Sequence, residues 1–274
     1  MLISFTMSFA AEKPWIGSGR SYESANKYSE ANMDVLITGS DGYIGRHVSK
    51  IFPDANMCGK GKAFCDVRGF NGTVIHLAAH SNVAESICNP EKYLRNNALK
   101  IAQFLQNNSV LRMILFSTGG GQLYSNRLMA KETDASWSTC MNPYGQSKWM
   151  AEEIVKLMVP SYCILRPSNV YGGGNSPVHS HFENDIPIVL YGENQIREFV
   201  HIDVVVEAAR RAVENRTEGI YNIGSGVGTN LTELAQQYSK RRNVPIRLEP
   251  KRLGDILDRI SLDCTAARAA GLME

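Results

Sequence analysis

The chain has 274 residues, of which 43% are hydrophobic and 20% are charged, and its formal net charge is +2. This length and composition are typical of a soluble globular protein with one core, while the small charge and the lack of a basic run among aromatics argue against a nucleic-acid partner. The six cysteines lack C-x-x-C spacing, which favours reduced thiols in the cytoplasm over disulfides or a metal site.

The first 32 residues are rich in Ser, Gly, Glu and Tyr without a hydrophobic period, so we expect residues 1–32 to be a poorly ordered N-terminal extension. Residues 1–11 are mildly apolar, but they lack a preceding Lys or Arg and are too short to cross a bilayer. We therefore expect neither a secretory signal nor a membrane anchor.

A short apolar run, Met33–Ile37, leads directly into the glycine-rich segment Thr38–Gly45. Strand, glycine turn and helix in this order are typical of a dinucleotide site, because glycines let the backbone approach a pyrophosphate and the helix N-terminus attracts its charge. The spacing differs from G-x-G-x-x-G, so the turn alone does not identify such a site.

Strands and helices alternate along the rest of the chain. We expect strands at 56–59, 73–77, 113–117, 162–165 and 219–223, and helices at 42–52, 93–107, 143–159 and 203–215. This alternation predicts an α/β fold with a Rossmann-type, doubly wound parallel sheet covered by helices on both faces. Residues 33–171 would form the cofactor-binding core, and residues 172–274 would complete it and add a small, shortened C-terminal substrate lobe.

A tyrosine and a lysine lie four residues apart where a helix is expected to begin. Asn142 is a good N-cap, Pro143 suits the first helical position, and the side chains of Tyr144 and Lys148 then share one face. On its own such a pair is usually an exposed feature of an amphipathic helix. An adjacent ammonium would, however, lower the pKa of the tyrosine, which could then exchange a proton with a sugar or alcohol hydroxyl.

Further segments in a fixed order join these two motifs. They are Asp66-Val67, residues 74–79, Asn89-Pro90 with Tyr93, residues 116–120, 165–172, 197–203, 221–226 and 252–255. From Met33 to the C-terminus the chain resembles the extended short-chain dehydrogenase/reductase superfamily, specifically its NAD-dependent epimerase/dehydratase branch, which acts on nucleotide sugars.

The resemblance implies oxidation of a sugar hydroxyl with hydride transfer to a nicotinamide. Tyr144 would be the base, Lys148 would hold the nicotinamide ribose, and Thr118, or Ser117 in reserve, would hydrogen-bond the reacting sugar oxygen. In dehydratase relatives an Asp-Glu pair follows the threonine, whereas Gly119–Gly121 follow it here. Dehydration is disfavoured because elimination of water lacks its acid and base.

The resemblance also assigns residues to the cofactor. They are Gly39, Gly42, Tyr43, Ile44 and Gly45 at the pyrophosphate, Asp66 and Val67 at the adenine, Leu77, Ala78 and Ala79 along the ribose-phosphate strand, and Asn97, Tyr144, Lys148 and Ser168. One departure is the end of the second strand, where the family has an acid for the adenosine ribose and this chain has Gly59-Lys60-Gly61-Lys62. The lysines would suit the 2′-phosphate of NADP, or they are simply solvated. NAD remains the predicted cofactor, because an epimerase recovers its hydride in each cycle, and NADP is the alternative.

Four residues match positions that hold the nucleoside diphosphate in sugar-nucleotide epimerases: Asn169, Arg197, Arg252 and Asp255. The implied function is that of an NAD-dependent nucleoside-diphosphate-sugar epimerase, acting at C4 as UDP-glucose 4-epimerase does. Two alternatives remain open, namely an NADP-dependent nucleotide keto-sugar reductase and a non-catalytic NAD(P)-binding regulator.

The resemblance further implies a homodimer. Helices 93–107 and 143–159 would form a four-helix interface with a second copy, through Leu94, Leu99, Trp149 and Met150.

Overall fold

The computed structural model describes residues 34–174, 180–251 and 257–274. The prediction made for residues 1–32, and those made for Arg252 and Asp255, lie outside the described residues. Among the helices of these three ranges, none is both long and apolar enough to cross a bilayer.

A six-stranded sheet with every neighbouring pair parallel forms the centre of the fold, in the order β10-β6-β4-β3-β1-β2. Its strands are β1 (Asp34–Thr38), β2 (Asn56–Cys58), β3 (Asn71–His76), β4 (Ser109–Phe116), β6 (Ser161–Pro167) and β10 (Gly219–Ile223). The order reverses between β1 and β3, so the predicted doubly wound α/β fold is confirmed.

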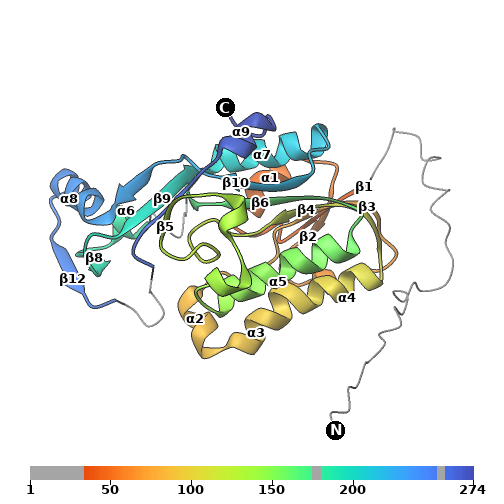
Figure 1. Ribbon diagram of the computed structural model, residues 1–274, viewed down its shortest axis with the longest axis horizontal. Coiled ribbons are helices and arrows are strands. Elements are labelled where there is room, and N and C mark those ends of the chain that lie inside the picture. Colours follow the sequence, from red (N-terminus) through yellow and green to blue (C-terminus); the bar gives the residue numbers. More distant parts are fainter. Residues whose placement is uncertain (1–33, 175–179, 252–256) are drawn as a thin grey trace, which may run out of the picture. The chain divides into compact units, whose positions relative to one another are not determined.

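Helices cover both faces of this sheet (Figure 1). On one face lie α1 (Gly45–Ile51), α7 (Ile202–Glu214) and α9 (Thr265–Ala269). On the other lie α2 (Val83–Cys88), α3 (Pro90–Leu94), a π-helical turn (Arg95–Leu99), α4 (Lys100–Gln106) and α5 (Pro143–Met158). In Figure 1 α4 and α5 run side by side below the sheet.

The sheet is apolar on both faces, because consecutive strand residues point to opposite faces and both are apolar. Ile37 and Ile75 belong to the apolar cluster under α1 and α7, whereas their neighbours Leu36 and Val74 belong to the cluster under α4 and α5. The continuous apolar runs that the sequence shows in these strands therefore have a packing origin.

Several element boundaries differ from the sequence-based expectation. The helix expected from residue 42 begins at Gly45, because Gly42–Ile44 still belong to the glycine turn. The helix expected at 93–107 begins at Pro90 and is interrupted by the π-helical turn, a feature that often occurs near functional sites. Strands β3 and β4 begin two and four residues before their expected starts, at Asn71 and Ser109.

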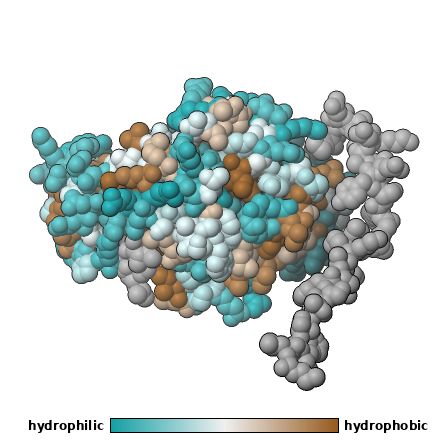
Figure 2. Space-filling model, in the orientation of Figure 1, coloured by the Kyte–Doolittle hydropathy of each residue, from teal (hydrophilic) through white to brown (hydrophobic). Residues whose placement is uncertain are grey.

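Smaller sheets and helices follow the core. They comprise β7 (Asn169–Tyr171), β9 (Ile196–His201) and β11 (Gly228–Asn230) in one sheet, β8 (Ile188–Tyr191) with β12 (Ile246–Glu249), β5 (Arg127–Ala130) with β13 (Ile260–Leu262), and the helices α6 (Ser180–Asn184) and α8 (Leu231–Arg242). The short α6 lies within the segment that was expected to form the shortened lobe. Hydrophilic residues dominate the surface around α8 at the left of Figure 2.

Candidate active site

The tyrosine and lysine of the sequence motif lie on the first turns of α5, as predicted. Asn142 caps the helix, since its Oδ1 accepts a hydrogen bond from Gly145 N at 2.9 Å, and Pro143 occupies the first turn. Tyr144 and Lys148 therefore project one turn apart towards the carboxyl end of β4.

Tyr144 is half-buried, and the side chain of Thr118 lies within hydrogen-bonding reach of its phenol. Burial raises the pKa of the Tyr144 phenol, and the hydrogen bond with Thr118 opposes that rise only in part. The neutral phenol is therefore favoured at neutral pH in this structure.

Lys148 was expected to lower the pKa of Tyr144, but its ammonium bonds a backbone carbonyl instead. Its Nζ donates to Phe116 O, at the end of β4, at 2.6 Å, and the side chain is buried. Burial lowers the pKa of Lys148 to about 8, while the charge of Glu152 opposes this shift. In this structure the lowering of the tyrosine pKa by Lys148 is thus not realised.

The two hydroxyls that end β4 have different partners. Ser117 Oγ donates to Glu152 Oε1 at 2.5 Å, whereas Thr118 faces Tyr144. The structure therefore brings Thr118, and not its reserve Ser117, to the tyrosine.

Glu152 belongs to a buried ionic network that the sequence analysis missed. Its carboxylate accepts from Arg166 Nε at 2.9 Å and from Arg166 Nη2 at 2.6 Å, and both side chains are at most 1% exposed. Arg166 Nη1 also donates to Tyr124 Oη at 2.9 Å. The available signal was spacing, because Glu152 lies one helical turn beyond Lys148 and so shares its face.

The glycines after Thr118 are packed against neighbouring atoms. A Cβ added at Gly119 would lie 2.4 Å from Arg166 O, and one at Gly121, whose φ is +101°, would lie 2.5 Å from Leu257 Cδ2. A carboxylate side chain has no room at Gly119 as the structure stands. The packing thus supports the inference from sequence that an acid-base pair for dehydration is absent here.

The glycine turn after β1 forms a close-packed cradle. Gly39 N donates to Cys58 O at 2.8 Å and Gly42 N to Gly39 O at 2.9 Å. A Cβ at Gly45 would lie 2.0 Å from Gly39 O, and one at Gly39 would lie 2.7 Å from Ala78 N. Only glycine permits this joining of the turn, α1 and the end of β3, which is the arrangement that receives a pyrophosphate in dinucleotide-binding folds.

Among the other predicted cofactor residues, Leu77 and Tyr43 are held at the carboxyl ends of the strands. Leu77 N donates to Thr38 O at 3.0 Å, and Tyr43 Oη donates to Gly172 O at 2.6 Å. Ile44, Val67 and Ala78 are half-buried, and Asp66 and Ala79 are exposed. Ser168 is 5% exposed, and its Oγ has no hydrogen-bond partner among the described residues. An unpartnered hydroxyl at the end of β6 fits a polar ligand there.

Asn97 is buried and connects the loop after β3 to α5. Its Oδ1 accepts from His80 N at 2.8 Å, and its Nδ2 donates to His80 O at 2.9 Å and to Ser147 Oγ at 3.0 Å. The π-helical turn places this amide between the two segments, so Asn97 fixes the loop relative to Tyr144.

The predicted substrate residues that the structure describes belong to the lobe strands. Asn169 Nδ2 donates to Glu198 O at 2.9 Å, and Arg197 Nη2 donates to Leu257 O at 2.7 Å and to Gln195 Oε1 at 2.9 Å. The predicted convergence of Arg197 with Arg252 cannot be placed, since Arg252 is not among the described residues.

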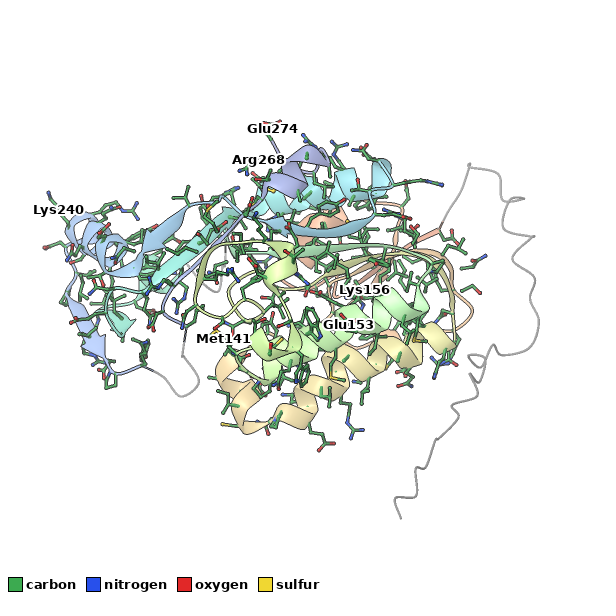
Figure 3. The ribbon with its side chains drawn as sticks, viewed as in Figure 1. Met141, Glu153, Lys156, Lys240, Arg268 and Glu274 are labelled. Carbon is green, nitrogen blue, oxygen red and sulfur yellow. The ribbon has the colours of Figure 1, made fainter. Side chains whose placement is uncertain are left out.

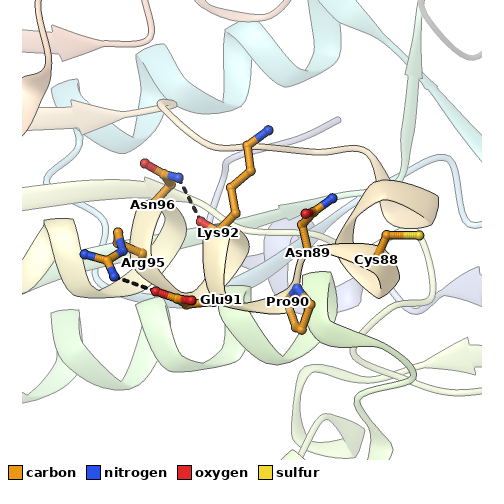
Figure 4. Close-up of a pocket in the computed structure, with 7 residues that line it drawn as sticks. All are labelled: Cys88, Asn89, Pro90, Glu91, Lys92, Arg95 and Asn96. Carbon is orange, nitrogen blue, oxygen red and sulfur yellow. Dashed lines mark hydrogen bonds and ion pairs between the residues drawn. The ribbon is translucent and has the colours of Figure 1, made fainter.

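A surface hollow lies where α2 meets α3 (Figure 4). Its lining consists of Cys88, Asn89, Pro90, Glu91, Lys92, Arg95 and Asn96. None of these is a predicted site residue, and the carboxylate of Glu91 is paired with Arg95 at 2.5 Å. We therefore place the candidate site at the carboxyl ends of the strands and not in this hollow.

The sequence matches the family described as “NAD dependent epimerase/dehydratase family” over residues 66–224, which is more than half of the chain. The chain belongs to this family. A putative UDP-glucose 4-epimerase of Methanocaldococcus jannaschii is 31% identical over 76% of this chain and 73% of its own length. A UDP-glucose 4-epimerase of Yersinia enterocolitica is 25% identical over 82% of this chain and 88% of its own length.

Solved structures share the fold of this family member. The UDP-glucose 4-epimerase of Thermus thermophilus, in complex with NAD, gives a TM-score of 0.74 at 24% identity and covers 88% of this chain and 93% of its own. A dTDP-glucose 4,6-dehydratase of Streptomyces venezuelae, bound to NAD, also gives 0.74, at 20% identity, with 86% and 90% covered. Because an epimerase and a dehydratase match equally well, the fold does not separate the two activities.

Proposed function

We propose that this protein is an NAD-dependent nucleoside-diphosphate-sugar epimerase that acts at C4, as its relatives named UDP-glucose 4-epimerase do. The observation that carries the proposal is that the side chain of Thr118 faces the Tyr144 phenol at the end of β4 and is followed directly by Gly119, where an acid has no room. Such a site supplies one base for one sugar hydroxyl and no second pair for elimination.

The residues act as follows in this proposal. Thr118 orients the sugar hydroxyl, and Tyr144 takes its proton and later returns it to the same oxygen. Lys148, whose Nζ donates to Phe116 O in this structure, would bind the hydroxyls of the nicotinamide ribose beside Tyr144. Bound NAD would supply the hydride acceptor and donor. Asn169, Arg197, Arg252 and Asp255 would hold the diphosphate of the substrate.

The test is an assay of purified protein with NAD and nucleoside-diphosphate hexoses carrying uridine, thymidine, guanosine or cytidine. We expect interconversion of C4 epimers of at least one of these sugars without net formation of NADH. Net consumption of NADPH with a keto sugar would instead assign the reductase activity. Dinucleotide binding without turnover of any sugar would favour the regulatory alternative and contradict the epimerase proposal.

The remaining predictions belong to the same proposal. We propose that residues 33–171 act as the cofactor-binding core, that residues 172–274 complete it with a reduced substrate lobe, and that the protein works in the cytoplasm as a homodimer. NAD is the proposed cofactor, with NADP as the alternative.

A further inference from the structure

The glycine turn carries an acid whose side chain reaches the neighbouring strand. Asp41 lies between Gly39 and Gly42, and its Oδ2 accepts a hydrogen bond from Lys60 N at 2.6 Å. A Cβ added at Gly59, the first residue after β2, would lie 2.1 Å from the same Oδ2. The carboxylate of Asp41 therefore occupies the space that a side chain at position 59 would take.

This is the place in the fold where an acid normally meets the adenosine ribose. In dinucleotide-binding sheets that acid follows the glycine turn by about 20 residues and ends the second strand. Gly59 is 20 residues after Gly39 and directly follows the end of β2 at Cys58. In this chain the carboxylate comes from Asp41 in the glycine turn. Gly59, at the position usually taken by the acid, has no side chain and leaves room for that carboxylate.

The position of the carboxylate is fixed by the backbone around it. Gly39 N and Ser40 N both donate to Cys58 O, at 2.8 and 3.4 Å, which ties the turn to the end of β2. Asp41 is exposed, and among the described residues its Oδ1 accepts no hydrogen bond. One oxygen thus anchors the side chain, and the other remains available to a ligand.

We propose that Asp41 binds the hydroxyls of the adenosine ribose and selects NAD against NADP, in place of the acid that β2 lacks. The inference rests on the proposed function, because it requires that the chain bind a dinucleotide. A carboxylate accepts hydrogen bonds from ribose hydroxyls and repels a 2′-phosphate at the same point.

The lysines beside this carboxylate act in the opposite direction. The backbone amide of Lys60 donates to Asp41, and the Lys60 ammonium takes no part in that bond. The charge of Lys62 is close enough to lower the pKa of the Cys58 thiol. The carboxylates of Asp41 and Asp66 raise the pKa of the same thiol, so both signs of charge meet at the end of β2. Asp41 decides the preference because its carboxylate fills the side-chain space at position 59.

The test is a calorimetric titration of nucleotide-free protein with NAD and with NADP, in the wild type and in Asp41→Asn. The asparagine retains an oxygen for Lys60 N, so the turn is preserved while the charge is lost. We expect the wild type to prefer NAD and the variant to reduce the NAD:NADP affinity ratio at least tenfold, which corresponds to about 1.4 kcal/mol. Asp41→Ala should reduce it at least as much.

Asp54→Asn is the matched control, since it removes an equally exposed acid near the opposite end of β2 and should leave the ratio unchanged. An unchanged ratio in both Asp41 variants, with dinucleotide still bound, would overturn this inference and leave the proposed function intact. A wild type that binds NADP tenfold more tightly would overturn it as well. Failure of the wild type to bind either dinucleotide would overturn both.

Discussion

Two side chains lie beside Tyr144, the hydroxyl-bearing Thr118 and the aromatic Tyr93. The Tyr144 phenol faces the Thr118 side chain. The ring of Tyr93 packs edge-on against the Tyr144 ring at 6.4 Å between centroids, and the Tyr93 hydroxyl donates to Glu85 at 3.0 Å. Tyr144→Phe should fold, bind dinucleotide and lose turnover by a factor of about 10² to 10⁴, the usual contribution of a positioned acid-base group.

Tyr93→Phe is the control for this variant, because it removes a phenol from the same surroundings and should retain most of the turnover. Steady-state rates and dinucleotide titrations of both proteins make the comparison. If Tyr144→Phe kept wild-type turnover, Tyr144 would have no acid-base role.

Removing the hydroxyl of Thr118 should mainly lower turnover, whereas removing that of Ser117 should mainly lower stability. Thr118→Val deletes a hydrogen bond to the reacting groups, worth about 1.5–3 kcal/mol where one partner is charged, so turnover should fall by about 10- to 150-fold with little loss of stability. Ser117→Ala removes a hydrogen bond to the buried Glu152 and should lower the free energy of unfolding more than it lowers turnover. The opposite pattern would return Ser117 to the catalytic role.

Sequence reasoning located residues whose neighbours are fixed by short spacing and missed those joined only by folding. Tyr144 and Lys148 follow from helical periodicity, and the cap at Asn142 follows from composition. The direction of Lys148 towards Phe116 O depends on how closely α5 approaches the end of β4, which no local pattern contains. Asp41 was overlooked because its partner, Lys60, lies 19 residues away in the turn after β2.

His76 should make the folded state sensitive to acid. The ring is buried, its Nδ1 lies 2.8 Å from Thr38 Oγ1, and burial lowers its pKa from 6.5 to about 3. Between pH 6.5 and 3 the unfolded chain binds a proton that the folded chain does not, so stability falls as the pH falls through this window. One such site contributes a slope of at most about 1.4 kcal/mol per pH unit.

Urea unfolding across that pH range tests the expectation. His76→Asn should lower stability at neutral pH and flatten its decline in acid. His201→Asn, which removes a histidine whose side chain is 41% exposed, should flatten it less. Equal slopes in wild type and His76→Asn would contradict the assignment.

At the scale of elements, the buried pair of Glu152 and Arg166 joins α5 to β6 next to the candidate active site. Removing one partner of a buried ion pair leaves a charge uncompensated, which typically costs about 3–5 kcal/mol. Glu152→Gln should therefore lower the free energy of unfolding by an amount of that order. Glu153→Gln alters the next residue of α5, which pairs with Lys156 on the outer side of the helix, and should cost less than about 1 kcal/mol (Figure 3).

Chemical denaturation of both variants measures the two losses in free energy of unfolding. A loss in Glu152→Gln no larger than that in Glu153→Gln would mean that the pair does not hold these elements together.

Element types were more predictable than element boundaries. All six strands of the main sheet were expected from short apolar runs, and β10 was placed at residues 219–223, where the structure has it. The break between α3 and α4 had no local signal, because the buried bonds of Asn97 to His80 and Ser147 involve partners 17 and 50 residues away. Tertiary contacts of this kind decide where a helix departs from regular geometry.

At the scale of the whole molecule, the exposed faces of α3, α4 and α5 remain the proposed dimer surface. Trp149, one of the expected contacts, is half-buried, packs against the core and lies 6.0 Å from the Arg166 guanidinium. Leu99, by contrast, is 51% exposed in the turn between α3 and α4, and Leu157 on α5 is 85% exposed. Apolar side chains gathered on neighbouring helices favour association with a second copy.

Light scattering at micromolar concentration should give the mass of a dimer. Leu99→Asp should shift the protein towards the monomer, because the dimer would have to bury an unpaired carboxylate in its interface. Leu248→Asp places the same charge at a residue of equal apolar type and similar exposure, 49%, on the lobe strand β12, and should leave the mass unchanged. A wild-type monomer, or a Leu99→Asp dimer as stable as the wild type, would exclude these helices as the interface.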